Sequence, residues 1–448
     1  MVPSSPKAPR FFRELPPTHR LLLIVGLFVA VYALLSYLGT GVMGYFLDPE
    51  LYSVVLDAGS TGTRVSVFRF SRASHRLMEA APGVLVVHHK VKGGLSDYGH
   101  DPDLARPGLR ELLLRAVQVI PSALRSRARV TLGATAGLRL LPPAQAEGLL
   151  EVARSEIVHQ GFSLPHPLLQ VFVMDGEDEA KYMWLTVNYA EAGGQLRGTG
   201  TSAVVDLGGG SVQLAYEVPA GSAPSYVVKG LHSSVGLYVH SWLGFGLKAF
   251  RMKVLEQGPY DGQPLGTSPC IAGTVFMAET YSYGGLTRDF RPDAIAEKAD
   301  RCRTVVTKAL GLNRPCPRAP CAFEGVWRGP GGAGLRKFKA FSYVMDIAQL
   351  AGLIPPSSPP TSQIELSPAD FLKASKRTCN GPPLAGELLW LCTDLVYIGV
   401  LLERGFGVGM DQRVTVAGKI KYSEGNQEYF VEAAWPLGLA VASTGALV

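Results

Sequence analysis

Two short segments of the sequence combine an aspartate with a loop rich in glycine, serine and threonine. The first reads DAGSTGT over residues 57–63, and the second reads DLGGGSV over residues 206–212. Glycine lets backbone N–H groups approach an anion closely, and hydroxyl side chains add further donors. The repeated device therefore predicts two loops that hold a polyphosphate from both sides.

The aspartates that open these segments, Asp57 and Asp206, would repel a phosphate on their own. Their placement is explained if a divalent cation, or its water shell, lies between the carboxylates and the phosphate. The alternative interpretation is a pair of ordinary glycine-rich hairpin turns. One segment alone fits that alternative, but two copies in the same strand context favour a shared ligand.

Each aspartate must be positioned by a strand–loop–strand unit within a larger fold. Apolar or alternating runs predict strands over residues 51–57, 64–70, 128–132, 168–174, 202–206 and 212–218. Composition and periodicity predict helices over residues 108–124, 143–159, 177–191, 338–351 and 384–404. This mixture of strands and helices predicts an α/β fold.

The composition is that of a globular protein with enough apolar residues for a sizeable core. The chain has 448 residues, of which 47% are hydrophobic and 18% are charged. These values exclude a disordered chain, a collagen and a small disulfide-rich protein. Half of the net charge of +6 lies in the N-terminal tail, and the nearly balanced remainder gives no case for nucleic-acid binding.

An uncharged segment close to the N-terminus is long enough to cross a bilayer. Residues 21–47 contain no charged side chain, and a basic tail, residues 1–20, precedes them. The positive-inside rule places this tail in the cytosol and the rest of the chain in a lumen or outside the cell. We therefore expect a single-pass type II signal anchor, and the short apolar core favours a Golgi membrane. The alternative is a cleaved signal peptide.

All six cysteines follow the predicted span and lie in the second half of the chain. An even number on the oxidising side of a membrane suggests three disulfides. Neighbour pairing predicts the bonds Cys270–Cys302, Cys316–Cys321 and Cys379–Cys392. The alternative, a zinc site, is disfavoured because no CxxC motif or suitably spaced histidine is present.

At these motifs the sequence resembles the apyrases, or nucleoside triphosphate diphosphohydrolases, of the actin/hexokinase-like superfamily. The resemblance extends over about residues 51–440 and includes five blocks characteristic of that family. The blocks are Asp57–Arg64, Gly133–Arg139, Gly176–Tyr189, Asp206–Gln213 and Trp435–Leu439. Smaller similarities occur at Tyr238–Gly246, Phe341–Asp346 and Cys392–Tyr397.

The resemblance implies two actin-like (RNase H-like) α/β lobes with a nucleotide cleft between them. Lobe I is expected over residues 49–174 plus 428–448, and lobe II, which holds all six cysteines, over residues 175–427. The implied activity is hydrolysis of terminal phosphates of nucleoside tri- or diphosphates with Ca²⁺ or Mg²⁺. Water attacks directly, without a covalent intermediate.

Three residues match the catalytic groups of the family. Glu179 matches the general base, which takes a proton from the attacking water. Ser211 and Gln213 match the residues that orient this water. Glu177 and Asp178 are nearby alternatives for the base, although acidic residues also favour a helix start because of its dipole.

The remaining site residues implied by the resemblance bind the cation and the phosphates. Asp57 and Asp206 are expected to hold the hydrated metal, assisted by Thr135. Arg64 either contacts phosphate or forms a structural salt bridge. The other expected phosphate-binding residues are Ser60, Thr61, Gly62, Thr63, Gly208, Gly209 and Gly210.

Some residues near the expected site have a less definite assignment. Tyr343 and Phe341 could stack on a nucleobase, although aromatic residues at this spacing are also typical of a core. Arg139 is interpreted as structural. Two departures from the family pattern, Ala180 after the base and Pro436 in the fifth block, are compatible with helical structure.

Two other function classes remain as alternatives to the hydrolase. An actin-like kinase or exopolyphosphatase is disfavoured by the expected lumenal topology, and Glu179 with Gln213 fits attack by water. An inactive binding protein of the same fold is disfavoured because every expected catalytic side chain is present.

Overall fold

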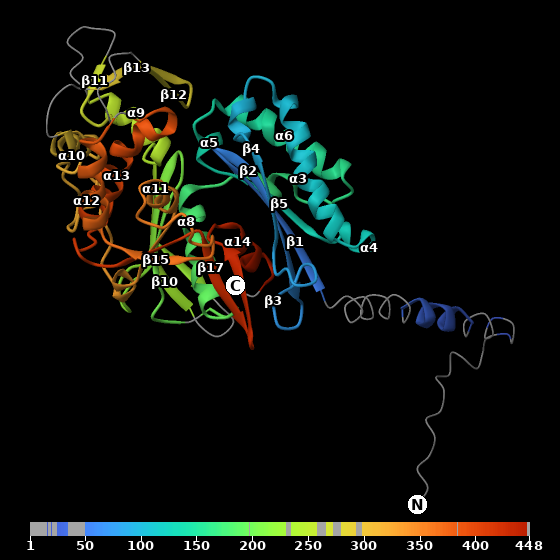
Figure 1. The fold of residues 1–448 in the computed structure, drawn as a ribbon. Coiled ribbons are helices and arrows are strands. Elements are labelled where there is room, and N and C mark those ends of the chain that lie inside the picture. Colours follow the sequence, from blue (N-terminus) through green and yellow to red (C-terminus); the bar gives the residue numbers. More distant parts are fainter. Residues whose placement is uncertain are drawn as a thin grey trace, which may run out of the picture. The chain divides into compact units, whose positions relative to one another are not determined.

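The computed structural model of the chain separates into two units, Met1–Glu50 and Leu51–Val448, which are described separately (Figure 1). The described residues are 16, 19, 25–34 and 50–445, apart from 197, 230–233, 258–265, 272–278, 293–297 and 383. Residues 25–34 are helical, whereas most of the predicted tail and of the predicted span lies outside the described residues. Among the described residues, no helix has both the length and the apolar character needed to cross a membrane.

The first sheet of the large unit has the strand order β3-β2-β1-β5-β6, with β4 beside β2. Strands β1 (Glu50–Gly59), β5 (Arg129–Ala134) and β6 (Val171–Val173) pair in parallel. Strands β3 (Leu77–Met78) and β4 (Val87–Lys92) pair antiparallel with β2 (Gly62–Ser71). The first aspartate loop is the connection between β1 and β2, as the sequence predicted.

Helices α3 (Arg106–Val119) and α6 (Pro143–His159) pack with this sheet (Figure 1). The single helix predicted over residues 108–124 is wrong, because Pro121 lacks an N–H group and separates α3 from α4 (Ser122–Arg125). The strand predicted over residues 168–174 is also too long, because its first part belongs to α7. The other short elements here are η1 (Leu95–Tyr98), η2 (Pro102–Ala105), α5 (Ala136–Arg139) and α7 (Pro167–Gln170).

The second sheet has the order β15-β16-β14-β7-β8-β10-β9. The pair β7 (Ala203–Leu207) and β8 (Ser211–Glu217) repeats the β1–β2 arrangement and carries the second aspartate loop. The helix predicted over residues 338–351 is wrong in its first part, where β14 (Phe338–Ser342) pairs in parallel with both β7 and β16. Burial on both faces favours this apolar segment as a central strand, and α11 follows it. The other strands are β9 (Tyr226–Lys229), β10 (Ser234–Leu243), β15 (Gln363–Leu366) and β16 (Val414–Ala417).

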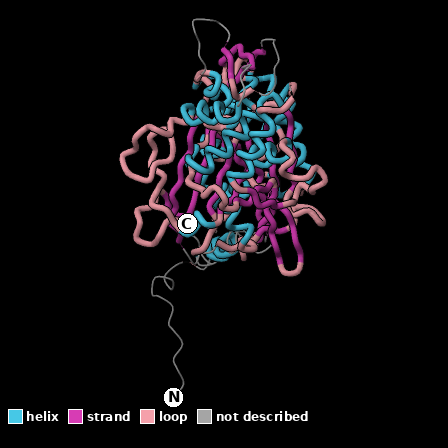
Figure 2. Tube along the Cα trace, turned by 60° about the vertical axis from the view of Figure 1, so that its left-hand side comes forward, coloured by secondary structure: helices cyan, strands magenta, loops and turns pink. Residues whose placement is uncertain are grey.

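The rest of the large unit contains both helices and strands (Figure 2). The helices are α8 (Gly176–Glu191), α9 (Leu247–Leu255), α10 (Lys298–Ala309), α11 (Tyr343–Leu350), α12 (Pro368–Cys379), α13 (Leu391–Val400) and α14 (Pro436–Ser443). Shorter turns are η3 (Ala333–Arg336), η4 (Gly386–Trp390) and η5 (Leu401–Gly405). A small sheet contains β11 (Gly266–Ser268), β12 (Glu279–Tyr283) and β13 (Leu286–Pro292), and β17 (Lys419–Glu424) pairs with β18 (Gln427–Glu432). Pro436 occupies the start of α14, where its missing N–H costs nothing.

Helix α8 connects the two sheet regions through its own buried cluster. It packs against β8 and β10 of the second sheet and against α14, which also contacts β2 of the first sheet. A Cβ atom on Gly438 would lie 2.0 Å from the carbonyl oxygen of Tyr182, so α14 approaches α8 backbone to backbone. This close contact holds α8 against α14. The boundaries of the two lobes stay a prediction.

The three disulfides are those predicted by neighbour pairing. Cys270–Cys302, Cys316–Cys321 and Cys379–Cys392 are all bonded. Four of these cysteines are fully buried in or beside the core of the second sheet region, and the Cys316–Cys321 bond lies nearer the surface. The prediction of a disulfide-bonded second half is confirmed.

Candidate active site

A pocket of about 350 Å³ lies where the two strand–loop–strand units meet. Both aspartate loops contribute to its wall, together with the first turn of α8 and the start of α11. The expected site residues that line it are Asp57, Ser60, Thr61, Arg64, Thr135, Glu179, Asp206, Gly208, Gly209, Gly210, Ser211 and Tyr343. The structure thus brings together residues that are far apart in the sequence.

The two loops face each other at close range. A Cβ atom on Gly209 would lie 2.5 Å from the Ser60 hydroxyl oxygen and 3.2 Å from the Thr61 methyl carbon. Any side chain at residue 209 would therefore displace the side chain of Ser60. The two loops are thus close enough to contact one ligand, and their binding of a polyphosphate stays a prediction.

The second loop is fixed by the N-terminus of α9. The carbonyl oxygens of Gly208 and Gly209 accept hydrogen bonds from the N–H groups of Leu247 (2.8 Å) and Ala249 (3.0 Å). These N–H groups belong to the first helical turn, which lacks partners within the helix. Because the loop carbonyls face α9, the N–H group of Gly209 has no backbone acceptor among the described residues and is available to an anion.

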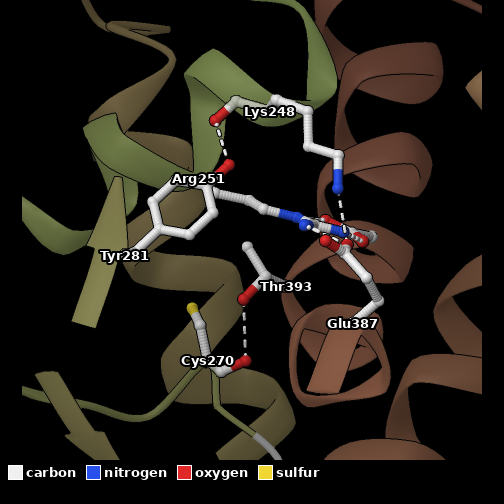
Figure 3. Close-up of polar contacts among 7 residues, drawn as sticks. Lys248, Arg251, Cys270, Tyr281, Glu387 and Thr393 are labelled. Atoms are coloured by element: carbon white, nitrogen blue, oxygen red, sulfur yellow. Dashed lines mark hydrogen bonds and ion pairs between the residues drawn. The ribbon is translucent and has the colours of Figure 1, made fainter. Parts of the chain in front are cut away.

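An ion-pair network centred on the buried Arg251–Asp394 pair holds α9 in this position (Figure 3). Arg251 of α9 donates to Asp394 of α13 through two nitrogens, at 3.0 and 2.6 Å, and to Glu387 at 2.8 Å. Lys248 also pairs with Glu387, and the Tyr281 hydroxyl donates to the Lys248 carbonyl oxygen at 2.8 Å. A bidentate, buried arginine–carboxylate pair is geometrically specific. The network therefore anchors the helix that supports the second loop.

The two aspartates are buried at the ends of their strands. Arg64 donates to Asp57 at 3.3 Å, and the Ser342 hydroxyl donates to Asp206 at 2.6 Å. Burial raises the pKa of Asp57, although the Arg64 guanidinium opposes this rise. Burial also raises the pKa of Asp206 to about 6, opposed by the Ser342 hydrogen bond and reinforced by the negative charge of Asp57.

This donor set fits a hydrated divalent cation. No group of three or more histidine, cysteine, aspartate or glutamate side chains with metal-binding geometry occurs among the described residues. Mg²⁺ commonly keeps several waters and is held by one or two carboxylates plus substrate phosphates. Burial raises the pKa of both Asp57 and Asp206, and the charge of Asp57 raises that of Asp206 further, so a cation between them would favour their ionised forms.

Glu179 lies in the first turn of α8 and reaches the same pocket. Its carboxylate pairs with Arg139 and accepts a hydrogen bond from Gln213 at 3.2 Å. Burial raises the pKa of Glu179 to about 8, against the influence of Arg139 and with a further contribution from the two aspartates. A carboxyl group with a pKa near neutrality is suited to proton transfer at physiological pH.

The side chains expected to orient water form one hydrogen-bonded group beside Glu179. The Gln213 amide nitrogen lies 2.7 Å from the Ser211 hydroxyl and 3.1 Å from the hydroxyl of Ser241. Ser211 lines the pocket, whereas Gln213 lies behind it and touches Glu179. A water near Ser211 would be close to both Glu179 and the two aspartate loops.

The neighbouring acids of α8 point to other partners. Glu177 accepts a hydrogen bond from the Tyr226 hydroxyl at 3.2 Å and lies 3.5 Å from His240, and Asp178 pairs with Lys181 at 2.5 Å. Neither acid lines the pocket. The geometry therefore favours Glu179 among the three candidates for the base.

Other expected site residues differ in their position. Gly62 and Thr63 continue into β2 and do not line the pocket, whereas Arg64 both lines it and pairs with Asp57. Tyr343 lines the pocket, but Phe341 is fully buried in the core and cannot contact a nucleobase.

The pocket also contains residues that sequence reasoning missed. His88 and Lys90 of β4 reach it, as do Ser342, Asp346 and Trp435. Burial lowers the pKa of Lys90, and the neighbouring Arg64 lowers it further. A basic residue in a strand carries no recognisable motif, so only the pairing of β4 with β2 reveals this position.

Two facing glycine-rich loops, two buried aspartates and a buried glutamate of raised pKa are the features expected of a phosphoanhydride hydrolase with an α/β fold. The model of the GDA1/CD39 (nucleoside phosphatase) family matches residues 48–447. The chain belongs to this family, and it is a hydrolase of the apyrase type.

Individual relatives are similar in sequence to this protein over most of the length of the chain. Probable apyrase 2 of Oryza sativa subsp. japonica is 37% identical, over 88% of this chain and 86% of that protein. A nucleoside-triphosphatase of Pisum sativum is 35% identical, over 92% of this chain and 93% of that protein. The crystal structure of nucleoside triphosphate hydrolases from Neospora caninum is similar in fold, with a TM-score of 0.54 at 15% identity, over 88% and 92% of the two chains.

Proposed function

We propose that this protein removes the terminal phosphate of nucleoside triphosphates, diphosphates or both, using Ca²⁺ or Mg²⁺ and Glu179 as general base. One observation carries the proposal: Glu179 lies in the pocket that both phosphate loops line, beside Ser211 and Gln213. The names of the relatives, an apyrase and a nucleoside-triphosphatase, support the substrate class.

The reaction follows from the positions of these groups. A water held near Ser211 attacks the terminal phosphorus while Glu179 accepts its proton, and the bond to the bridging oxygen of the leaving phosphate breaks. The N–H groups and hydroxyls of the two loops bind the oxygens on which charge develops. A cation held through water by Asp57 and Asp206 would neutralise phosphate charge.

The nucleoside is expected at the end of the pocket where α11 begins. Tyr343 starts α11 and its ring lines the pocket, close to the second loop: a Cβ atom on Gly209 would lie 3.7 Å from a ring carbon of Tyr343. An aromatic ring at this position can stack on a nucleobase. The proposal assigns no base preference.

The test is phosphate release from a panel of nucleoside tri- and diphosphates by the purified protein. Glu179→Gln should lower kcat by about 10²–10⁴, because glutamine keeps the size of the side chain but cannot accept the proton. Glu177→Gln is the matched control, since its side chain points to Tyr226 and His240, and should stay within a few-fold of wild type. A Glu179→Gln variant as active as wild type would contradict the assignment of the base.

The proposal includes a type II membrane anchor over residues 21–47, with the catalytic unit in the lumen of a secretory compartment such as the Golgi. Two observations support it. The helical residues 25–34 expose their large apolar side chains, among them Leu27, Phe28 and Tyr32, and the three disulfides suit an oxidising compartment.

A further inference from the structure

Arg139, at the end of α5, forms a partly buried ion pair with Glu179 of α8. Their side chains are 14% and 10% exposed. The pair joins the helix that follows β5 of the first sheet to the helix that packs against the second sheet. Among the described residues, Glu179 is the only hydrogen-bond partner of the guanidinium, and the Nε of Arg139 is buried without an acceptor. The position of Arg139 is therefore explained by Glu179 alone.

Both donors to Glu179 reach the same carboxylate oxygen. Arg139 Nη2 and Gln213 Nε2, the latter at 3.2 Å, bind Oε2. No described side chain donates to Oε1, so its lone pairs are available to a water in the pocket. A carboxylate fixed through one oxygen presents the other in one direction.

The start of α8 is shaped to accommodate this guanidinium. A Cβ atom on Gly176 would lie 2.5 Å from Arg139 Nη1 and 2.3 Å from the Ser241 hydroxyl oxygen. The φ angle of Gly176 is not in the left-handed region, so the requirement for glycine is one of space. Glycine at this position thus leaves room for Arg139 above the first turn of the helix.

We infer that Arg139 is a positioning residue for the general base, holding Oε2 of Glu179 so that Oε1 faces the attacking water. The inference rests on the proposed role of Glu179. Arg139 does not line the pocket, so it acts through Glu179 rather than on the substrate. Its effect should appear in kcat and leave KM nearly unchanged.

The charge of Arg139 gives this role a distinct pH signature. The charged groups that face Glu179 are Arg139, Asp206 and Asp57. Arg139 is the one that lowers the pKa of Glu179, and both aspartates raise it. Removing the guanidinium leaves the two negative charges unopposed. The acid limb of the pH profile of kcat/KM reports the pKa of the general base in the free enzyme. This limb should then move to higher pH.

The experiment compares Arg139→Gln, Arg139→Lys and Arg139→Ala with Arg154→Gln. Arg154 is the matched control because it is also a buried arginine, paired with Glu147 and Glu151 away from the pocket. Arg139→Gln should lower kcat by about 10²-fold, as expected when a reacting group is misplaced by about 1 Å. Its acid limb should shift to higher pH. Arg139→Lys should keep the acid limb nearer the wild-type position but still lose rate, because its single ammonium cannot reproduce the planar geometry.

Chemical rescue separates positioning from general destabilisation. Millimolar guanidinium ion should restore part of the kcat of Arg139→Ala and should do nothing for Arg154→Gln. Gly176→Ala should reproduce the kcat loss and pH shift of Arg139→Gln, because the added methyl group displaces the guanidinium.

The outcomes distinguish this inference from the proposed function. If Glu179→Gln is inactive but Arg139→Gln keeps both the wild-type pH profile and a kcat within three-fold, Arg139 does not position the base. A kcat loss in Arg139→Ala with no pH shift and no rescue would also overturn the inference. If Glu179→Gln is active, the assignment of the base itself is wrong.

Discussion

The Ser342 hydroxyl donates a hydrogen bond of 2.6 Å to Oδ1 of Asp206, although Ser342 itself has a positive φ of 58°. It stands where β14 ends and α11 begins, and the parallel register of β14 with β7 places it beside the second loop. A positive φ costs a non-glycine residue on the order of 1–3 kcal/mol. The strained backbone directs the hydroxyl at a carboxylate that lines the pocket.

Substitutions of Ser342 should separate the strain from the hydrogen bond. Ser342→Ala and Ser342→Gly both lose the bond, but only glycine tolerates the positive φ, so the glycine variant should be more stable by about 1 kcal/mol. Chemical unfolding at neutral pH measures this difference. Both variants should need more cation for half-maximal activity, because Asp206 loses the donor that lowers its pKa. Equal stability of the two variants would argue against the strain.

Removal of the cation should abolish activity. EDTA should stop phosphate release, and excess Ca²⁺ or Mg²⁺ should restore it, because in the proposed site two buried aspartates face a polyphosphate and need a positive charge between them. Asp57→Asn and Asp206→Asn should each raise the cation concentration needed for half-maximal rate at least ten-fold, a difference of about 1.4 kcal/mol. Asp300→Asn, on the exposed surface of α10, controls for the loss of one negative charge. Full activity in chelator would contradict the metal assignment.

The sequence predicted the parts of the site that depend on local chemistry. The two aspartate loops, Glu179 and the three disulfides carry recognisable residue types at recognisable spacings, and the structure places the loops and Glu179 in one pocket. Ser342 and Arg139 were not predicted as contacts of Asp206 and Glu179. Their roles depend on which strand lies beside β7 and on how α5 meets α8, and neither relationship is encoded in local periodicity.

The same limit explains the errors in the predicted elements. The segment at 338–351 has the apolar content of a helix, but its first five residues are a strand because they fill the gap between β7 and β16. Short apolar runs do not distinguish a buried helix from a buried strand. Pairing with β7 and β16, rather than local composition, determines that residues 338–342 form a strand.

The raised pKa of Glu179 should make the protein less stable as pH rises. Its folded pKa of about 8 exceeds the unfolded value of 4.5, so the folded state binds more protons between these two pH values. Stability attributable to this group is therefore present below pH 4.5 and is lost as pH rises to 8. Glu179→Gln removes the free-energy cost of ionising a buried carboxyl group. This variant should therefore be more stable than wild type at pH 8, by on the order of a few kcal/mol, but not at pH 5. Thermal unfolding at the two pH values checks this, with Glu177→Gln as the control.

The disulfides should differ in their contribution to stability. The chain-entropy model predicts a larger loss when the longer loop is opened, and the separations are 32 residues for Cys270–Cys302 and 5 for Cys316–Cys321. Replacing the first pair by serine should cost about 1–2 kcal/mol more than replacing the second. The buried environment of Cys270 and Cys302 adds to this difference. Comparable losses in chemical unfolding would indicate that loop length and burial do not control the effect.

The proposed topology predicts which side of the membrane receives glycans. Pro356→Asn completes an Asn-Ser-Ser acceptor in an exposed loop of the large unit, and Pro3→Asn completes the same tripeptide in the tail. In microsomes the first variant should gain a glycan, because its loop lies in the lumen, and the second should not. In the proposed topology the segment at 21–47 is retained, so an epitope at the N-terminus should remain attached to the mature chain. Loss of that epitope would favour a cleaved signal peptide, and the reverse glycan pattern would place the catalytic unit, with its three disulfides, on the cytosolic side.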